Sequence, residues 1–143
     1  MSTLPPAAPP RWHRIALLVA ALQCLAWGLF ILALPEKAAT VYGLDKPLTD
    51  LFLWKGTGLI ILLFGVGYGI ASTDPVRNWS VIVPGFIAKI LGPVGMVMSV
   101  YNGEVSSRVL FLLPINDVIW WIPFALILLA AYRQRTQGTK ISF

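Results

Sequence analysis

The sequence predicts an all-α membrane protein, a polytopic bundle of four transmembrane helices. Of its 143 residues, 57% are hydrophobic and 12% are charged, and the mean hydropathy is +0.77. Soluble domains are about 45 to 50% apolar and about 25% charged, so this composition is typical of a chain solvated by lipid. Four apolar runs each approach the roughly 20 residues with which a helix crosses about 30 Å of hydrocarbon. They leave no segment long enough for a separate soluble domain.

The expected helices follow these apolar runs in order. They cover residues 15–34, 51–71, 79–101 and 112–132. The first run ends at Pro35, and Asp74 and Pro75 separate the second run from the third. Asn78 or Ser80 can cap the third helix. The first run is longer than the roughly 7 to 15 apolar residues of a cleaved signal peptide, and no A-x-A-like site follows it, so we expect a retained anchor.

Short tails flank the transmembrane domain, which we expect to span residues 15–132. Residues 1–14 are rich in proline and have no periodic apolar pattern, which predicts a flexible tail. Residues 133–143 form a second tail, which is basic.

Basic residues are unevenly divided between the two ends of the predicted bundle. One end carries Arg11, Arg14, Arg77, Arg133, Arg135 and Lys140, and the other carries Lys37, Lys46 and Arg108. Because cytoplasmic flanks hold the excess of lysine and arginine, this distribution predicts that both termini lie in the cytoplasm. The formal net charge of +5 is then mainly a topological signal, and we expect no nucleic-acid partner.

Three ionisable residues lie inside the predicted helices, where each costs about 2.5 to 3.5 kcal/mol at the bilayer centre unless it has a partner. They are Lys55, Lys89 and Asp117, and Gln23 and Asn116 are their neutral counterparts. At a rise of about 1.5 Å per residue, Gln23 and Lys89 both lie about 12 to 15 Å from the cytoplasmic end, so they can meet. Lys55 and Asp117 both lie about one turn from the opposite end, and we expect them to form an ion pair. Lys89 is long enough to approach Asp117 as well.

Small residues share a helix face with each of these lysines. They are Gly58, Gly65 and Gly69 in the second helix, and Gly85, Gly92 and Pro93 in the third. Such faces let neighbouring helices approach closely, so we expect them to pack into the bundle. Pro93 should also kink the third helix and free a carbonyl near residue 89, which Lys89, a water or a serine-like group could satisfy.

Four aromatic residues fall near the same polar positions. They are Trp27, Trp120, Trp121 and Phe124. The tryptophans lie too deep for the interfacial belt, and two interpretations remain open. The rings either fill the bundle core, or line a pocket with Lys89, Gln23 and Asp117 that suits an amphipathic lipid, an isoprenoid quinone or an anionic headgroup. In the same way, the charges either lock the helices together or anchor a ligand.

Residue patterns that indicate catalysis or metal binding are scarce. His13 is the only histidine and Cys24 the only cysteine, and there is no phosphate loop, GxSxG or HExxH motif. We therefore expect no enzymatic activity, no metal and no cofactor of the protein's own, although a bound lipid or quinone fits the pocket interpretation.

Short motifs add a family resemblance. "YGL" at residues 42–44, a glycine-rich second helix and "ND" at Asn116 and Asp117 make the chain similar to the DoxX-like group of small four-helix bacterial inner-membrane proteins. The resemblance implies a multi-pass protein of the bacterial inner membrane that accompanies redox enzymes and thiol or quinone stress systems. It brings no family active site, and the single cysteine argues against direct thiol chemistry.

Two functional hypotheses follow. The first is a non-catalytic accessory or assembly subunit of a larger bacterial membrane complex, associated with respiratory or photosynthetic redox chemistry, whose partners are the lipid bilayer and other membrane subunits. The second is a small oligomeric transporter or lipid- or quinone-binding membrane protein. A third, an enzyme that acts on a lipid, would need its substrate bound near Asp117.

Overall fold

The computed structural model describes residues 9–44 and 49–139, with side chains as far as residue 136. This part of the chain is mostly helical, and four of its helical segments are long and apolar enough to cross a membrane. They are Arg11–Ala33, Leu51–Thr73, Trp79–Tyr101 and Leu113–Thr136. For the described residues, the predicted helical architecture with four apolar segments of membrane-spanning length is thereby confirmed. Residues 1–8 and 140–143 of the two predicted tails lie outside the described residues.

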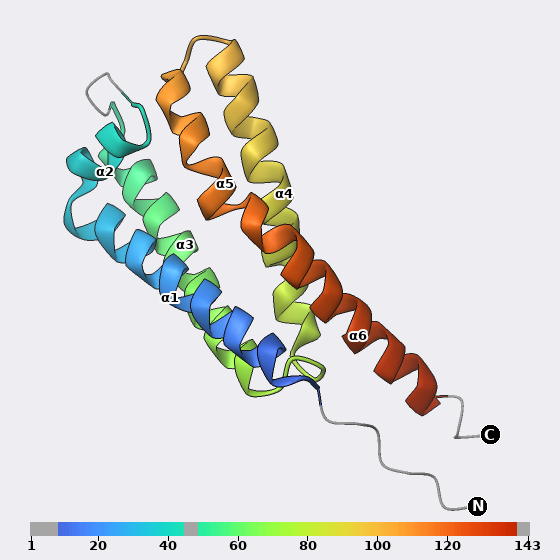
Figure 1. Cartoon of the computed structure of the whole chain (residues 1–143). Helices are drawn as coiled ribbons and strands as arrows, with labels where there is room; N and C mark the ends of the chain where they lie inside the picture. Colours follow the sequence, from blue (N-terminus) through green and yellow to red (C-terminus); the bar gives the residue numbers. More distant parts are fainter. Residues whose placement is uncertain (1–8, 45–48, 140–143) are drawn as a thin grey trace, which may run out of the picture.

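Helices α1 (Arg11–Ala33) and α3 (Leu51–Thr73) form the most extensive helix contact of the fold. Figure 1 shows them crossing as one pair, beside a second pair made by α4 (Trp79–Tyr101) and the C-terminal helices. Glycines set the close approach of α1 and α3. A Cβ added to Gly28 would lie 2.8 Å from the Gly58 carbonyl oxygen, and one added to Gly65 would lie 3.0 Å from that of Ala21.

The glycine faces expected to pack into the bundle do so only in part. Gly58 and Gly65 pack against α1, and a Cβ on Gly85 would overlap the Tyr68 hydroxyl of α3. In contrast, a Cβ on Gly69 or Gly92 would meet no atom within 4 Å. The α3 glycine row therefore serves the α1 contact over part of its length, and Gly92 faces open space.

A short helix, α2 (Pro35–Val41), lies in the segment between α1 and α3. No helix was predicted there from the sequence. Pro35 enters its first turn, where the missing N–H costs nothing, and the helix ends before Gly43, whose φ of +75° favours glycine. The Trp54 indole donates a hydrogen bond to the Pro35 carbonyl at 2.9 Å, which ties α2 to the start of α3. The "YGL" motif thus contributes a helix stop.

The fourth expected helix, 112–132, is broken in the structure. Its C-terminal half lies in α6 (Trp121–Thr139), preceded by η1 (Ser107–Phe111), α5 (Leu113–Asn116) and η2 (Val118–Trp120). Asp117 leaves the helical region, with φ −126° and ψ −55°. Pro123 has no N–H for the Ile119 carbonyl, which lies in η2 two residues after Asp117. The expectation of a continuous helix was wrong here.

The N-terminus of α1, the α3–α4 turn and the C-terminus of α6 lie at the same end of the molecule (Figure 1). Arg14 supports this end by donating hydrogen bonds to the carbonyls of Ser72 and Thr73, at 2.9 and 2.8 Å. The basic residues assigned above to the cytoplasmic end lie here, except Lys140, which is outside the described ranges. Lys46, assigned to the opposite end, is also outside them. The cytoplasmic placement of this end stays a prediction.

The buried core packs between α1, α3, α4 and α6, with Tyr68 and Phe124 among its largest members.

Candidate functional site

Lys89 and Asp117 form a buried ion pair halfway along the bundle. The Lys89 Nζ lies 3.2 Å from the Asp117 Oδ1, and the two side chains are 10% and 12% exposed. Lys55, the expected partner of Asp117, is instead exposed on the first turns of α3. The difference follows from helix packing, because α4 contacts η2 and α6 whereas α3 packs mainly on α1. Depth alone could not identify which helix would be the neighbour.

The break in the fourth span explains why polar side chains gather here. At a helix break, carbonyls lose their intrahelical donors, and inside a membrane no water would replace them. Gln23 Nε2 donates to the Ile115 carbonyl at 3.1 Å and to Asn116 Oδ1 at 3.2 Å. Lys89 Nζ donates to the Asn116 carbonyl at 2.6 Å. Gln23 and Lys89 therefore meet through this broken backbone rather than by direct contact.

Two tryptophans complete what we call the polar cluster. Its members are Gln23, Lys89, Asn116, Asp117, Trp120 and Trp121. The Trp120 indole donates to Gln23 Oε1 at 2.6 Å, and the Trp121 indole donates to the Lys89 carbonyl at 2.8 Å. That carbonyl lies four residues before Pro93, which has no N–H to offer. The freed carbonyl was expected, but its partner is an indole from the fourth span rather than a lysine, a water or a hydroxyl.

Replacing Trp121 by phenylalanine is expected to destabilise the protein by about 1 kcal/mol, because the Lys89 carbonyl then lacks a donor. The measurement is unfolding in mixed detergent micelles. In a Pro93→Ala background the backbone N–H of residue 93 can reach this carbonyl, so the same Trp121→Phe change should cost less. An equal cost in both backgrounds would show that the indole contributes only by packing.

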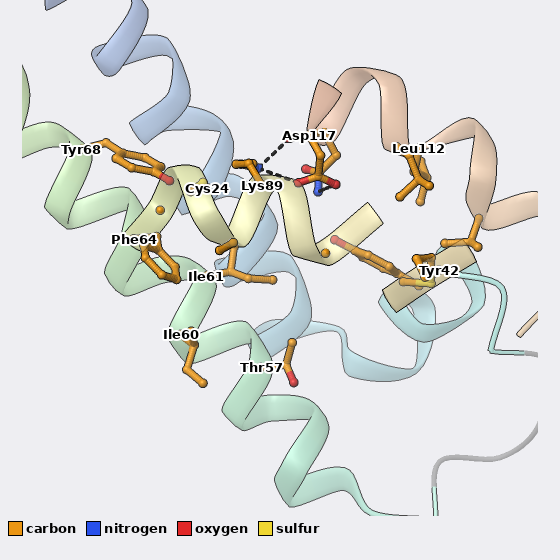
Figure 2. A pocket seen from close by; sticks show the side chains of 17 residues that line it. Cys24, Tyr42, Thr57, Ile60, Ile61, Phe64, Tyr68, Lys89, Leu112 and Asp117 are labelled. Atoms are coloured by element: carbon orange, nitrogen blue, oxygen red, sulfur yellow. Dashed lines mark hydrogen bonds and ion pairs between the residues drawn. The ribbon is translucent and has the colours of Figure 1, made fainter. Parts of the chain in front are cut away.

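A cavity of about 330 Å³ adjoins the polar cluster between α3 and α4 (Figure 2). It is lined by Cys24, Tyr42, Thr57, Ile60, Ile61, Phe64, Tyr68, Gly85, Ala88, Lys89, Gly92, Met96, Val109, Leu112, Leu113, Asn116 and Asp117. Most of this lining is apolar, and its charged members are Lys89 and Asp117. The cavity is therefore an apolar chamber with one polar wall.

The aromatic candidates do not line this cavity. Trp120 and Phe124 are buried in the core, and Trp27 packs edge-on against Tyr42, with ring centroids 5.4 Å apart. Trp121 faces the Lys89 backbone instead. The rings that do line the cavity are those of Tyr42, Phe64 and Tyr68. Tyr68 was not predicted as a site residue. Its place within the glycine-rich segment "GVGYGIA" was the sequence feature that could have indicated it.

Two tyrosine hydroxyls point into the cavity from opposite sides, with the ion pair between them (Figure 2). In the described part of the chain, neither hydroxyl makes a hydrogen bond. Burial, together with the negative charge of Asp117, raises the pKa of Tyr42 to about 12, so its phenol stays protonated and can donate. Tyr68 is 1% exposed and lies directly over Gly85. Both tyrosines line the cavity, Tyr42 as a half-buried residue and Tyr68 as a buried one.

Each oxygen of the Asp117 carboxylate already has a donor. Oδ1 pairs with Lys89, and Oδ2 accepts from Asn116 Nδ2 at 3.2 Å. The charges of the pair compensate each other, so the cavity presents a polar wall with little net charge. Among the described residues, no group of three or more His, Cys, Asp or Glu side chains could hold a metal ion.

Comparisons with protein-family models, with curated proteins and with solved structures found no match.

Proposed function

We propose that this is a bacterial inner-membrane protein that binds a small amphipathic membrane molecule, a lipid or an isoprenoid quinone, in the cavity between α3 and α4. The observation that carries the proposal is an apolar cavity of about 330 Å³ that ends at a buried polar cluster. Ligand sites combine mostly apolar walls with a few placed polar groups, and they measure about 300 to 1,000 Å³. This volume suits a headgroup and the first part of a tail.

The polar cluster alone would be explained by structure, since its members satisfy the broken backbone. The two tyrosine hydroxyls are not explained in that way, because they point into the cavity and support no backbone group. Each hydroxyl lies on the cavity lining, so a ligand acceptor in the cavity could accept a hydrogen bond from it. The hydroxyls therefore favour a ligand over a purely structural role.

We infer binding rather than catalysis. Lys89 and Asp117 hold each other and neighbouring polar groups, which leaves neither poised as a free base. The Cys24 thiol is buried among apolar groups, where thiols are unreactive. With both ends of the described chain on the cytoplasmic side, the cavity would lie within the bilayer and receive its ligand from the lipid phase.

A second candidate function is the accessory subunit of a larger redox-associated membrane complex. The observation that favours it is a set of glycines on α3 and α4 with no atom within 4 Å of an added Cβ, namely Gly56, Gly69, Gly92 and Gly95. Small residues let helices of another chain approach. Purification from native membranes with mass spectrometry of the co-purifying proteins tests this candidate, and a monomer without crosslinked partners would contradict it.

The ligand proposal is tested by filling the cavity. Gly92→Leu should weaken binding of a quinone to the full chain in lipid nanodiscs by about tenfold or more, because the added side chain occupies ligand volume. Gly95→Leu is the matched control, since Gly95 also faces open space on α4 but does not line the cavity. Quenching of tryptophan fluorescence measures the affinity, and mass spectrometry identifies lipids and quinones retained after purification. Equal affinities for the two variants, or no retained or added ligand, would contradict the proposal.

A further inference from the structure

We propose that the bound molecule has an uncharged head bearing carbonyl oxygens, as in an isoprenoid quinone, and that its tail leaves sideways through a groove between α3 and α4. This inference rests on the proposed function and specifies the ligand and its direction. It draws on the charge balance of the polar cluster and on a second cavity that adjoins the first.

The second cavity, which we call the tail groove, measures about 270 Å³. It is lined by Ile60, Leu63, Phe64, Gly67, Val81 and Pro84. Ile60 and Phe64 also line the main cavity, so the two spaces adjoin at these two side chains. Every lining residue of the groove is apolar or glycine, which is the environment that a hydrocarbon tail requires.

The direction of the groove follows from its position on the helices. Val81 lies eight residues before Lys89 on α4, which is about 12 Å along the helix axis. The groove therefore lies on the side of the main cavity that is nearer the α3–α4 turn, at the end where α1 begins. Ile60 and Leu63 are 57% exposed on the outer face of α3, so the groove opens to the lipid. It narrows at Gly67, where an added Cβ would lie 2.9 Å from Val81 Cγ1.

The polar cluster selects against a charged head. An anion near Lys89 would also meet the Asp117 carboxylate, 3.2 Å from the lysine nitrogen, and a cation near Asp117 would meet Lys89. The hydroxyls of Tyr42 and Tyr68 line the same cavity, and each can donate one hydrogen bond. Carbonyl oxygens accept hydrogen bonds without charge, so a quinone-type head matches this wall.

The test compares ligands with and without a tail. A long-tailed benzoquinone and its methyl-substituted, tail-less head analogue are titrated against the full chain in neutral phosphatidylcholine nanodiscs, with concentrations expressed as mole fraction in the membrane. We expect the tailed quinone to bind at least about tenfold more tightly. Anionic phosphatidylglycerol, added at the same mole fractions, should not displace it.

A groove variant locates the tail. Leu63→Trp fills the groove at a lipid-exposed position, so folding should be retained, and it should lower the affinity for the tailed quinone to that for the head analogue. Val97→Trp is the control, because Val97 is exposed on α4 and lines neither cavity.

Distinct results separate the failures. Equal binding of both ligands, or a Leu63→Trp variant that leaves the tailed quinone unaffected, overturns the tail path while the proposed function stands. Displacement by phosphatidylglycerol overturns the uncharged head. Absence of binding by either quinone, with a different lipid class retained after purification, overturns this inference and keeps the cavity as a ligand site. Absence of any retained or added ligand overturns both.

Discussion

Replacing Lys89 by methionine is expected to lower the free energy of unfolding by about 3 to 5 kcal/mol, because the change leaves the Asp117 carboxylate buried without its cation. It also removes the donor to the Asn116 carbonyl, which the helix break left without an intrahelical partner. Methionine has a similar length and is apolar, so lost packing contributes little. Unfolding by increasing mole fractions of SDS, followed by circular dichroism, measures the effect.

Lys55→Met is the matched control, because Lys55 is a lysine of the same bundle whose side chain is exposed on α3. It should change the unfolding free energy by less than about 1 kcal/mol. The double variant Lys89→Met with Asp117→Leu removes both charges and should recover much of the lost stability. If Lys55→Met proved as damaging as Lys89→Met, the ion pair described here would not be the one that operates in the membrane.

The same variants separate the two roles of the polar cluster. If Lys89 and Asp117 only hold the bundle, the double variant should be stable and should still bind a quinone through the tyrosine hydroxyls. If they also form the head site, the double variant should be stable with weakened binding. Tyr68→Phe provides an independent measure, since it removes one cavity hydroxyl without touching the ion pair.

Hydropathy predicted the four long apolar segments well because the length of an apolar run is a local property. The third helix begins and ends where the sequence placed it, at Trp79 and Tyr101. The break at Asp117 was not predicted, although Pro123 was visible, because prolines are also tolerated in continuous membrane helices. Whether a helix can break inside a membrane depends on which side chains can satisfy the freed carbonyls, here those of Ile115 and Asn116. Those side chains, Gln23 and Lys89, come from other helices.

The polar cluster was predicted in composition but not in pairing. Depth counting brought Lys89, Gln23 and Asp117 near one another, yet it assigned Asp117 to Lys55 because it carried no information on which helices are neighbours. A pocket at Lys89 and Asp117 was one of the two interpretations left open, but its tyrosine lining was missed for a related reason. Tyr42 belongs to the connection after the first span. A prediction that considered only residues within the spans could not place its hydroxyl opposite that of Tyr68.

Gly28→Ala is expected to destabilise the protein by about 2 to 3 kcal/mol, at the upper end of the cost of overpacking. A Cβ at this position would lie 2.7 Å from the Leu62 backbone nitrogen and 2.8 Å from the Gly58 carbonyl oxygen. Both atoms belong to the α3 backbone, so no side chain can rotate away and the two helices must separate. Unfolding in SDS again measures the effect.

Gly69→Ala is the control that makes this result specific. Gly69 forms a GxxxG pair with Gly65, so the motif predicts the same packing role for both positions. A Cβ added to Gly69, however, would meet no atom within 4 Å. Alanine favours the helix over glycine by up to about 1 kcal/mol, so Gly69→Ala should be neutral or slightly stabilising. Gly65→Ala should resemble Gly28→Ala, because its added Cβ would lie 2.9 Å from the Leu25 backbone nitrogen. Similar effects at Gly65 and Gly69 would mean that the α1–α3 contact extends further along α3 than the structure places it.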